Sequence, residues 1–321
     1  MEGRKEQVSF VIPCYNSEKT LGTVIEEIKE RMQNDSSQME YEIILVNDCS
    51  RDDTFAVIKE LSEKNDRITG IDLARNFGQH AALMAGFHYV KGDYVICLDD
   101  DGQMPIESVG DMLALLQKDT DVVQGKYAGA KQNILRRFGS WVNAKMNEWL
   151  LSKPKDLEMN SFWGAKRFII DEIIRYEGAY PYIGGLVLRA TRNIKNLEVK
   201  HRARMEGKSG YTFGKLLFLW VNGFTAFSEK PLRIASLCGV ACAFAGLIFA
   251  FATVVRKLLN PNILVGYSSL IAIILFMGGM IMMMLGILGE YIGRMYICMN
   301  RSPQYVIREV INCGEEEKEQ I

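Results

Sequence analysis

Three short polar clusters in the first third of the chain carry the side chains best suited to chemistry. They are Pro13-Cys14-Tyr15-Asn16, Asn47-Asp48-Cys49-Ser50 and Asp99-Asp100-Asp101-Gly102-Gln103. Each follows a short apolar run, as residues at the carboxyl end of a buried strand do. One such cluster is typical of an ordinary turn, because Asn, Asp, Gly and Ser favour turns for backbone reasons. Three of them, each after a strand-like segment, predict a binding site.

Asp99 and Asp101 are the strongest candidate ligands for a metal ion. One residue separates them at the end of a strand-like run, so alternation places both carboxylates on the same side. Two like charges held that close are unfavourable unless a cation lies between them. Carboxylate oxygens suit Mg²⁺ or Mn²⁺, and Gln103 adds a neutral oxygen. An acidic, solvated turn without a metal is the alternative, and the absence of a Cys/His cluster disfavours zinc.

An alternation of strand-like and helical segments must position these clusters. The predicted strands are 8–13, 42–48, 68–73, 94–99 and 121–126, and the predicted helices are 17–31, 52–64, 79–89 and 105–117. Such alternation predicts a mostly parallel sheet with helices on both faces. Ligands bind these sheets beyond the carboxyl ends of the strands, which is where the three clusters fall.

Composition and missing motifs exclude several classes of protein. Among 321 residues, 38 Lys and Arg balance 39 Asp and Glu, whereas a nucleic-acid-binding protein normally carries a basic excess. We therefore expect no nucleic-acid partner. The seven cysteines form no C-x-x-C pair, which predicts free thiols in a reducing compartment. No dinucleotide-binding, P-loop or nucleophile-elbow motif is present, which disfavours dehydrogenases, P-loop NTPases and α/β-hydrolases.

The C-terminal third has the pattern of a membrane anchor. Residues 234–255 and 263–289 contain no Asp, Glu, Lys or Arg, and each exceeds the ~20 apolar residues that cross a bilayer. Residues 211–227 are aromatic-rich with a single charge, which favours an interfacial helix over an ordinary core helix. The expected order is a catalytic domain (1–210), an interfacial segment (211–233), two transmembrane helices (within 234–289) and a C-terminal segment (290–321).

The distribution of charge predicts the orientation of this hairpin. Cationic residues concentrate on the cytoplasmic side of membrane proteins. Six of them flank the two spans and two lie between: Lys215, Lys230, Arg233, Arg294, Arg301 and Arg308, against Arg256 and Lys257. We therefore expect a multi-pass protein of the cytoplasmic (inner) membrane, with the catalytic domain and both termini in the cytoplasm.

Five segments resemble family 2 glycosyltransferases. They are VIPCYNSEKTL (11–21), VNDCSRDDT (46–54), LARNFGQHAALMAGF (73–87), GDYVICLDDDGQMPIE (92–107) and SGYTFGKLLFLWVNGFTAFSEKPLR (209–233). The chain is most similar to the polyisoprenyl-phosphate branch, which includes dolichol-phosphate mannose synthase and bacterial undecaprenyl-phosphate sugar transferases. This resemblance implies a Rossmann-like GT-A fold. It also implies inverting, metal-dependent transfer of a monosaccharide from a nucleotide sugar, with UDP best supported, to a lipid phosphate such as undecaprenyl phosphate.

The resemblance also assigns roles to individual residues. Those matching the nucleotide-sugar site are Pro13, Tyr15, Asn16, Asp48, Arg75 and Asp99, and those matching the metal and diphosphate ligands are Asp99, Asp101 and Gln103. Those matching basic positions near the acceptor phosphate are Lys126, Arg136, Arg202 and Arg204, and the candidate catalytic residues are Asp99, Asp101 and Arg136. The implied partners are a nucleotide sugar, a polyisoprenyl phosphate and the membrane, and a homo-oligomer is left open.

Three positions depart from the family pattern. Ser17 stands where relatives have glutamate, Asn47 where they have aspartate, and Trp163, after Phe162, where they have arginine. Two alternatives therefore stay open: a nucleotide-sugar-binding subunit of a membrane complex that has lost turnover, and a processive polysaccharide synthase. The synthase would carry a Q-x-x-R-W motif and more membrane spans, and the sequence has neither.

The predicted chemistry requires no catalytic histidine. A lipid monophosphate has a second pKa of about 6, so it is largely a dianion at pH 7. Such an oxygen attacks an anomeric carbon without a general base, and the protein needs to align the reactants and neutralise the leaving diphosphate. We therefore interpret His80, His88 and His201 as structural residues.

Overall fold

A computed structural model describes residues 5–34, 39–127, 153–154, 157–199, 266–300 and 302–313, together with single residues between 237 and 259. Contacts divide the chain into two compact units. One combines Met1–Tyr211 with Ser302–Ile321, and the other is Thr212–Arg301.

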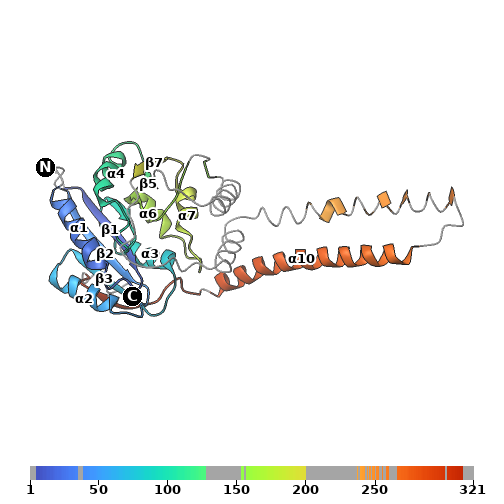
Figure 1. Cartoon of the computed structure of the whole chain (residues 1–321), viewed down its shortest axis with the longest axis horizontal. Helices are drawn as coiled ribbons and strands as arrows, with labels where there is room; N and C mark the ends of the chain where they lie inside the picture. The colour runs from blue at the N-terminus through green and yellow to red at the C-terminus, as the bar shows by residue number, and fades with distance from the viewer. Residues whose placement is uncertain are drawn as a thin grey trace. The chain divides into compact units, whose positions relative to one another are not determined.

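A mixed sheet forms the centre of the first unit (Figure 1). Among the described residues it has eight strands, in the order β7-β5-β6-β4-β1-β2-β3-β8. The bounds are β1 Gln7–Cys14, β2 Glu40–Asn47, β3 Ile68–Leu73, β4 Tyr94–Cys97, β5 Val122–Tyr127, β6 Trp163–Lys166, β7 Ile194–Val199 and β8 Ile307–Ile311. Strands β1 to β4 pair in parallel, whereas β6 and β8 are antiparallel to their neighbours. The expected mostly parallel α/β sheet is confirmed.

Helices cover both faces of this sheet (Figure 1). Their bounds are α1 Leu21–Gln33, α2 Thr54–Lys64, α3 Gln79–Phe87, α4 Val109–Leu116, α6 Arg167–Ile173 and α7 Ile183–Ala190. Alternation along β1 divides the core, because Phe10 and Ile12 pack with α1, α2 and α4 while Val11 packs with α3, α6 and α7. Helix α3 approaches the strands closely at Gly86, where a Cβ would lie 2.7 Å from Val11 Cγ1.

Several predicted boundaries are wrong at the helix ends. Helix α1 begins at Leu21 rather than at residue 17, because the Ser17 carbonyl accepts hydrogen bonds from the Thr20 and Leu21 amides and closes a turn first. The predicted helix 105–117 is a 3₁₀ turn, Ile106–Ser108, followed by α4. The apolar pattern predicts none of strands β6, β7 and β8, since each is short or has a mixed, partly exposed face.

The last strand belongs to the same unit as the first. Strand β8 pairs antiparallel with β3, aligning Ile71 with Val310 and Asp72 with Glu309. The predicted order makes residues 290–321 a separate cytoplasmic segment. In the structure, residues 307–311 instead form the edge strand of the first unit's sheet. Arg308, one of the six charges used to predict orientation, lies in this strand, which leaves five flanking charges against two.

The second unit contains a long apolar helix, α10 Tyr267–Met299. Within it, Phe276–Ile297 has a mean hydropathy of 1.5 and is the one helix of the described residues long and apolar enough to cross a membrane. Its apolar side chains, including Phe276, Met282 and Leu285, are exposed, unlike those of a buried core helix. The helix extends ten residues beyond the predicted end of the second span at 289, and the described residues of the first span are helical.

Candidate active site

The Asp99–Gln103 loop follows β4 and is tied to the loop after β1 by its middle carboxylate. Asp100 Oδ2 accepts a hydrogen bond from the Tyr15 amide at 2.9 Å, and its carbonyl accepts one from Thr20 Oγ1 at 2.7 Å. The loop turns at Gly102, whose φ of 70° favours glycine. The amide of Gln103 donates to Asp101 Oδ1 at 3.1 Å. Asp100 therefore joins the loops after β4 and β1, and Asp99 and Asp101 are left as the candidate metal ligands of this loop.

Two polar side chains orient Asp99. Gln79 Nε2 donates to its Oδ1 at 2.7 Å, and Ser161 Oγ donates to its Oδ2. Burial raises the pKa of Asp99 to about 6, and the charges of Asp101 and Asp100 add to this against the two hydrogen bonds. Burial and the charges of Asp99 and Asp101 likewise raise the pKa of Tyr127 to about 12. Tyr127, whose hydroxyl donates to Met104 Sδ at 3.0 Å, is therefore a neutral phenol within range of their charges.

The donor set at this loop fits a hard divalent cation. Asp99 and Asp101 repel each other, and a cation between them would remove that repulsion. No group of three or more His, Cys, Asp or Glu side chains that could hold a metal occurs in the part of the chain that the structure describes. Mg²⁺ usually takes one or two carboxylates and completes its shell with water and substrate phosphates. The pair therefore fits a metal that binds together with a diphosphate, and Gln103 would be the third protein ligand.

The raised pKa of Asp99 predicts how metal binding depends on pH. Below pH ~6 a metal ion must displace a proton from this carboxylate, so we expect affinity to fall by up to about tenfold per pH unit as the pH drops from 6 to 5. Between pH 7 and 8 affinity should be nearly constant. Titration calorimetry with Mn²⁺ measures this, and a dissociation constant unchanged from pH 5 to 8 would contradict the proposed ligand.

Asp48 holds a loop that continues from β3. Its Oδ1 accepts from the Phe77 amide at 2.7 Å and its Oδ2 from the Gly78 amide at 2.8 Å, and burial raises the pKa of its carboxyl. Each oxygen keeps a second lone pair, so a further hydrogen bond from a nucleotide base is compatible with this geometry. In the same loop the Arg75 guanidinium lies over the Phe77 ring, 4.6 Å from its centroid.

The loops after β1 and β2 hold each other. The Asn16 amide donates to Ser50 Oγ at 3.0 Å, and the Arg51 amide donates to Asn16 Oδ1 at 2.9 Å. Asn16 and Cys49 have φ values of 54° and 52°, a left-handed conformation that is strained outside glycine and concentrates at functional sites. Pro13 aligns with Val46 on the paired strands, and Tyr15 is exposed beside Asp100.

Two residues at or next to the departures from the family pattern have local partners: Glu18, which follows Ser17, and Asn47. Glu18 Oε2 accepts from the Asp53 amide at 3.1 Å, just before α2, so this carboxylate joins the β1 loop to that helix. Asn47 Nδ2 donates to the buried Asp72 Oδ1 at 2.6 Å. An aspartate at position 47 would set a second carboxylate against Asp72, which explains the amide.

A pocket of about 180 Å³ lies beside Asp99, since Gln79 and Ser161 both line it and both donate to that carboxylate. The remaining lining residues are His80, Leu83, Gln124, Met159, Asn160, Trp163, Tyr182, Ile183, Gly184 and Val187. The Trp163 ring is buried and packs edge-on against Phe87, with centroids 6.1 Å apart. At the position where relatives carry arginine, this chain therefore has an apolar wall.

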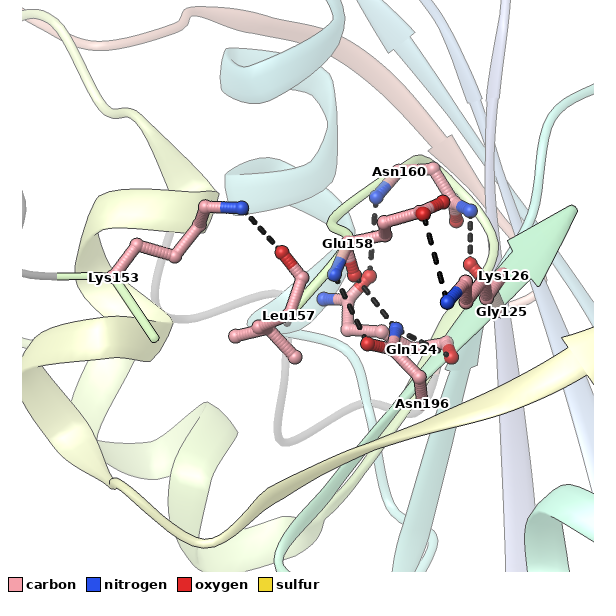
Figure 2. Close-up of polar contacts among 8 residues, drawn as sticks. All are labelled: Gln124, Gly125, Lys126, Lys153, Leu157, Glu158, Asn160 and Asn196. Atoms are coloured by element: carbon pink, nitrogen blue, oxygen red, sulfur yellow. Dashed lines mark hydrogen bonds and ion pairs between the residues drawn. The ribbon is translucent and has the colours of Figure 1, made fainter. Parts of the chain in front are cut away.

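One wall of the pocket is fixed by hydrogen bonds to β5 and β7 (Figure 2). The Asn160 amide donates to Gln124 Oε1 at 3.2 Å, and the Asn160 side chain donates to the Gly125 carbonyl. Asn196 Nδ2 donates to the Glu158 carbonyl at 2.8 Å, and the Glu158 amide donates to Asn196 Oδ1 at 3.0 Å. Ser161 is thereby held in position to reach Asp99.

The expected acceptor-phosphate residues are only partly described. Lys126, near the end of β5, forms an ion pair of 3.8 Å with Glu158, which lies on the same segment as Asn160 (Figure 2). Arg136, Arg202 and Arg204 lie outside the described residues, as does His201. His80 lines the pocket with its ring edge-on to Tyr182, and His88 Nδ1 lies 2.9 Å from the Met84 carbonyl.

The structure adds residues that the sequence did not single out. Gln79 and Ser161 donate to Asp99, the charges of Asp99 and Asp101 act on Tyr127, and Asn160 and Tyr182 line the pocket. Gln79 belongs to a segment that carries the family resemblance, which was a usable signal. Ser161 lies 62 residues from Asp99 and has no such signal.

Two models of known protein families match this chain, one in each of its two units. The model of glycosyl transferase family 2 matches residues 9–175, and that of the GtrB C-terminal hairpin matches residues 230–295. The undecaprenyl-phosphate 4-deoxy-4-formamido-L-arabinose transferase of Proteus mirabilis is 33% identical over 98% of this chain and 97% of its own length. The prophage bactoprenol glucosyl transferase homolog of Escherichia coli is 30% identical over 95% and 99%.

A solved structure shares the fold. Glucosyl-3-phosphoglycerate synthase from Mycobacterium tuberculosis, in complex with Mn²⁺ and UDP-glucose, superimposes with a TM-score of 0.51 at 18% identity. The match covers 68% of this chain and 77% of that one. The expected GT-A fold is thereby confirmed.

Proposed function

Because the chain belongs to glycosyl transferase family 2, we propose that it transfers a monosaccharide from a nucleotide sugar to a polyisoprenyl phosphate at the cytoplasmic membrane face. The observation that carries this proposal is the carboxylate pair Asp99/Asp101, with a pocket of about 180 Å³ beside Asp99. Full-length similarity to undecaprenyl-phosphate sugar transferases supports the lipid phosphate as acceptor. A UDP-sugar is the proposed donor, as the family resemblance implies.

The chain's own residues orient the donor. Asp99, Asp101 and Gln103 would hold Mg²⁺ or Mn²⁺, which when bound neutralises charge on the leaving diphosphate. Gln79 and Ser161 fix the orientation of Asp99 by donating to both of its oxygens. Asp48 and the β1 loop form the nucleotide side of the site, and the pocket beside Gln79 takes the sugar. With its reactants aligned, the transfer proceeds by in-line displacement and inversion.

The acceptor supplies its own nucleophile. A phosphate dianion needs no side chain to remove a proton, and the protein's task is to hold it beside the anomeric carbon. Lys126 is the described cation proposed for that role, together with Arg136, Arg202 and Arg204.

The position of β8 supports an even number of membrane crossings. Residues 5–199 and 302–313 belong to one folded unit, so the intervening chain must return to the side that it left. A hairpin satisfies this requirement, whereas a single crossing does not. The excess of flanking cations supports a cytoplasmic position for the catalytic unit.

Cysteine labelling tests the topology. In a variant without native cysteines, a cysteine at Asn260 should react with membrane-impermeant maleimide added to intact cells. A cysteine within 315–319 should react only after lysis. The reverse pattern would place the catalytic unit outside the cell, away from nucleotide sugars, and would contradict the proposed function.

Turnover separates the proposal from a binding-only subunit. The purified protein should be incubated with undecaprenyl phosphate and a panel of nucleotide sugars, and the products identified by mass spectrometry. One donor should yield a lipid-phosphate monosaccharide. Binding of a nucleotide sugar without product from any donor would favour the subunit alternative, which the buried Trp163 keeps open.

A further inference from the structure

One arginine on β8 reaches the segment that leads from β3 into the loop 74–78. Arg308 Nη1 lies 2.8 Å from Asp72 Oδ2, and its Nη2 donates to the Ala74 carbonyl at 2.9 Å. The Ala74 amide donates in turn to the Val306 carbonyl at 2.8 Å. The Asp72 side chain is only 3% exposed, whereas that of Arg308 is 56% exposed. The guanidinium therefore covers a buried carboxylate from the edge of the sheet.

A chain of hydrogen bonds extends from this ion pair to the proposed nucleotide loops. The other oxygen of Asp72 accepts from Asn47 Nδ2 at 2.6 Å. Asn47 Oδ1 accepts from the Ser50 amide at 3.2 Å, and Ser50 Oγ accepts from the Asn16 amide at 3.0 Å. Asp48, the residue after Asn47, accepts from the Phe77 and Gly78 amides, so the loop 47–51 in turn holds the loop 74–78.

Charge makes this network dependent on Arg308. A buried carboxylate is costly unless a cation or hydrogen-bond donors compensate it, and removing one partner of such a pair leaves an uncompensated charge. The adjacent residue offers a contrast, because Glu309 pairs with Lys59 at 3.5 Å with both side chains about half exposed. Exposed ion pairs of that kind contribute little to the stability of the fold.

We infer that Arg308 is a positioning residue for the nucleotide-sugar site. Through Asp72 and Ala74 it fixes the loops 47–51 and 74–78, so that donor binding depends on the strand that follows the membrane anchor. The inference rests on the proposed function only in taking these loops as part of the donor site.

Hydrogen exchange on the full-length protein in nanodiscs tests the positioning directly. Arg308→Gln should speed exchange of the Ser50, Phe77 and Gly78 amides by about tenfold or more, because Ser50 donates to Asn47 and the other two donate to the adjacent Asp48. Exchange in β4 should stay at the wild-type rate, which a general loss of structure would not allow. Glu309→Gln is the matched control on the same strand and should change neither. Wild-type exchange at all three amides in Arg308→Gln would overturn the inference.

Binding of UDP alone tests the functional consequence. Affinity should fall by about 10- to 100-fold in Arg308→Gln, since a small misplacement of a binding loop has effects of that size. Arg308→Lys keeps the charge but loses the forked contact with Ala74, so its affinity should be intermediate.

If Arg308→Gln does not fold, Asp72→Asn combined with Arg308→Gln removes the uncompensated charge, and this variant should still bind UDP weakly. Wild-type affinity in either variant would overturn the inference. A wild-type protein that transfers no sugar would remove the proposed function, and the exchange comparison would still decide the positioning role.

Discussion

Replacing Asp101 with asparagine should reduce turnover by about 10³-fold, because losing a metal ligand removes several kcal/mol of charge stabilisation at ~1.4 kcal/mol per tenfold in rate. The fold should survive. Asp101 Oδ1 accepts the Gln103 amide, and the asparagine carbonyl can accept the same hydrogen bond. Initial rates with saturating donor, together with a thermal melt, measure both expectations.

A control and a chelator complete this prediction. Asp111→Asn removes an exposed carboxylate from the first turn of α4, away from the site, and should leave turnover unchanged. EDTA should abolish wild-type activity, and excess Mn²⁺ or Mg²⁺ should restore it. Full activity in EDTA would mean that the carboxylates serve no metal.

The second large effect concerns the acceptor. A free polyprenol, which has a hydroxyl in place of the phosphate, should be glycosylated at least about 10²-fold more slowly, because no positioned base is proposed to remove its proton. The acidic limb of the rate should follow the acceptor's second ionisation near pH ~6. Since burial places the pKa of Asp99 in the same range without metal, the pH profile must be measured at saturating metal. A phosphonate acceptor has a higher second pKa and should therefore shift the acidic limb of the pH profile to higher pH.

Histidine and arginine variants separate the acceptor's ionisation from that of the protein. Single changes of His80, His88 or His201 to glutamine should leave the acidic limb in place. Changing Arg202 and Arg204 together to glutamine should raise the KM for the lipid phosphate and leave UDP affinity nearly unchanged, because a dianion loses charge-assisted partners. A limb that moves with one histidine would identify a protein base.

The parts of the fold that the sequence predicts are those whose pattern is local. Strands β1, β2 and β4 are buried along most of their length and are mainly apolar, so the polar clusters at their carboxyl ends stand out. Strands β6 to β8 are short or half exposed and lack such a run. The pattern predicts helix ends less well, because the residue types at 17–20 do not distinguish the turn that precedes α1 from a first helical turn.

Contacts between distant segments account for what the sequence could not predict. The carboxylate of Asp99 depends on Ser161, and that of Asp72 on Arg308, 236 residues away. The sequence position of Arg308 predicts a membrane-flanking charge, yet this residue forms an ion pair within the first unit. The Asn47 departure likewise acquires a reason only when its neighbour is Asp72.

The transfer reaction itself tests the central claim most directly. Purified protein, Mn²⁺ and a panel of UDP-sugars should be supplied with undecaprenyl phosphate, and the lipid product identified by mass spectrometry. We predict a single monosaccharide joined to the lipid through its phosphate, with the anomeric configuration inverted relative to the donor. Failure of any donor to give product, or a sugar joined to free undecaprenol as fast as to its phosphate, would contradict the proposed function.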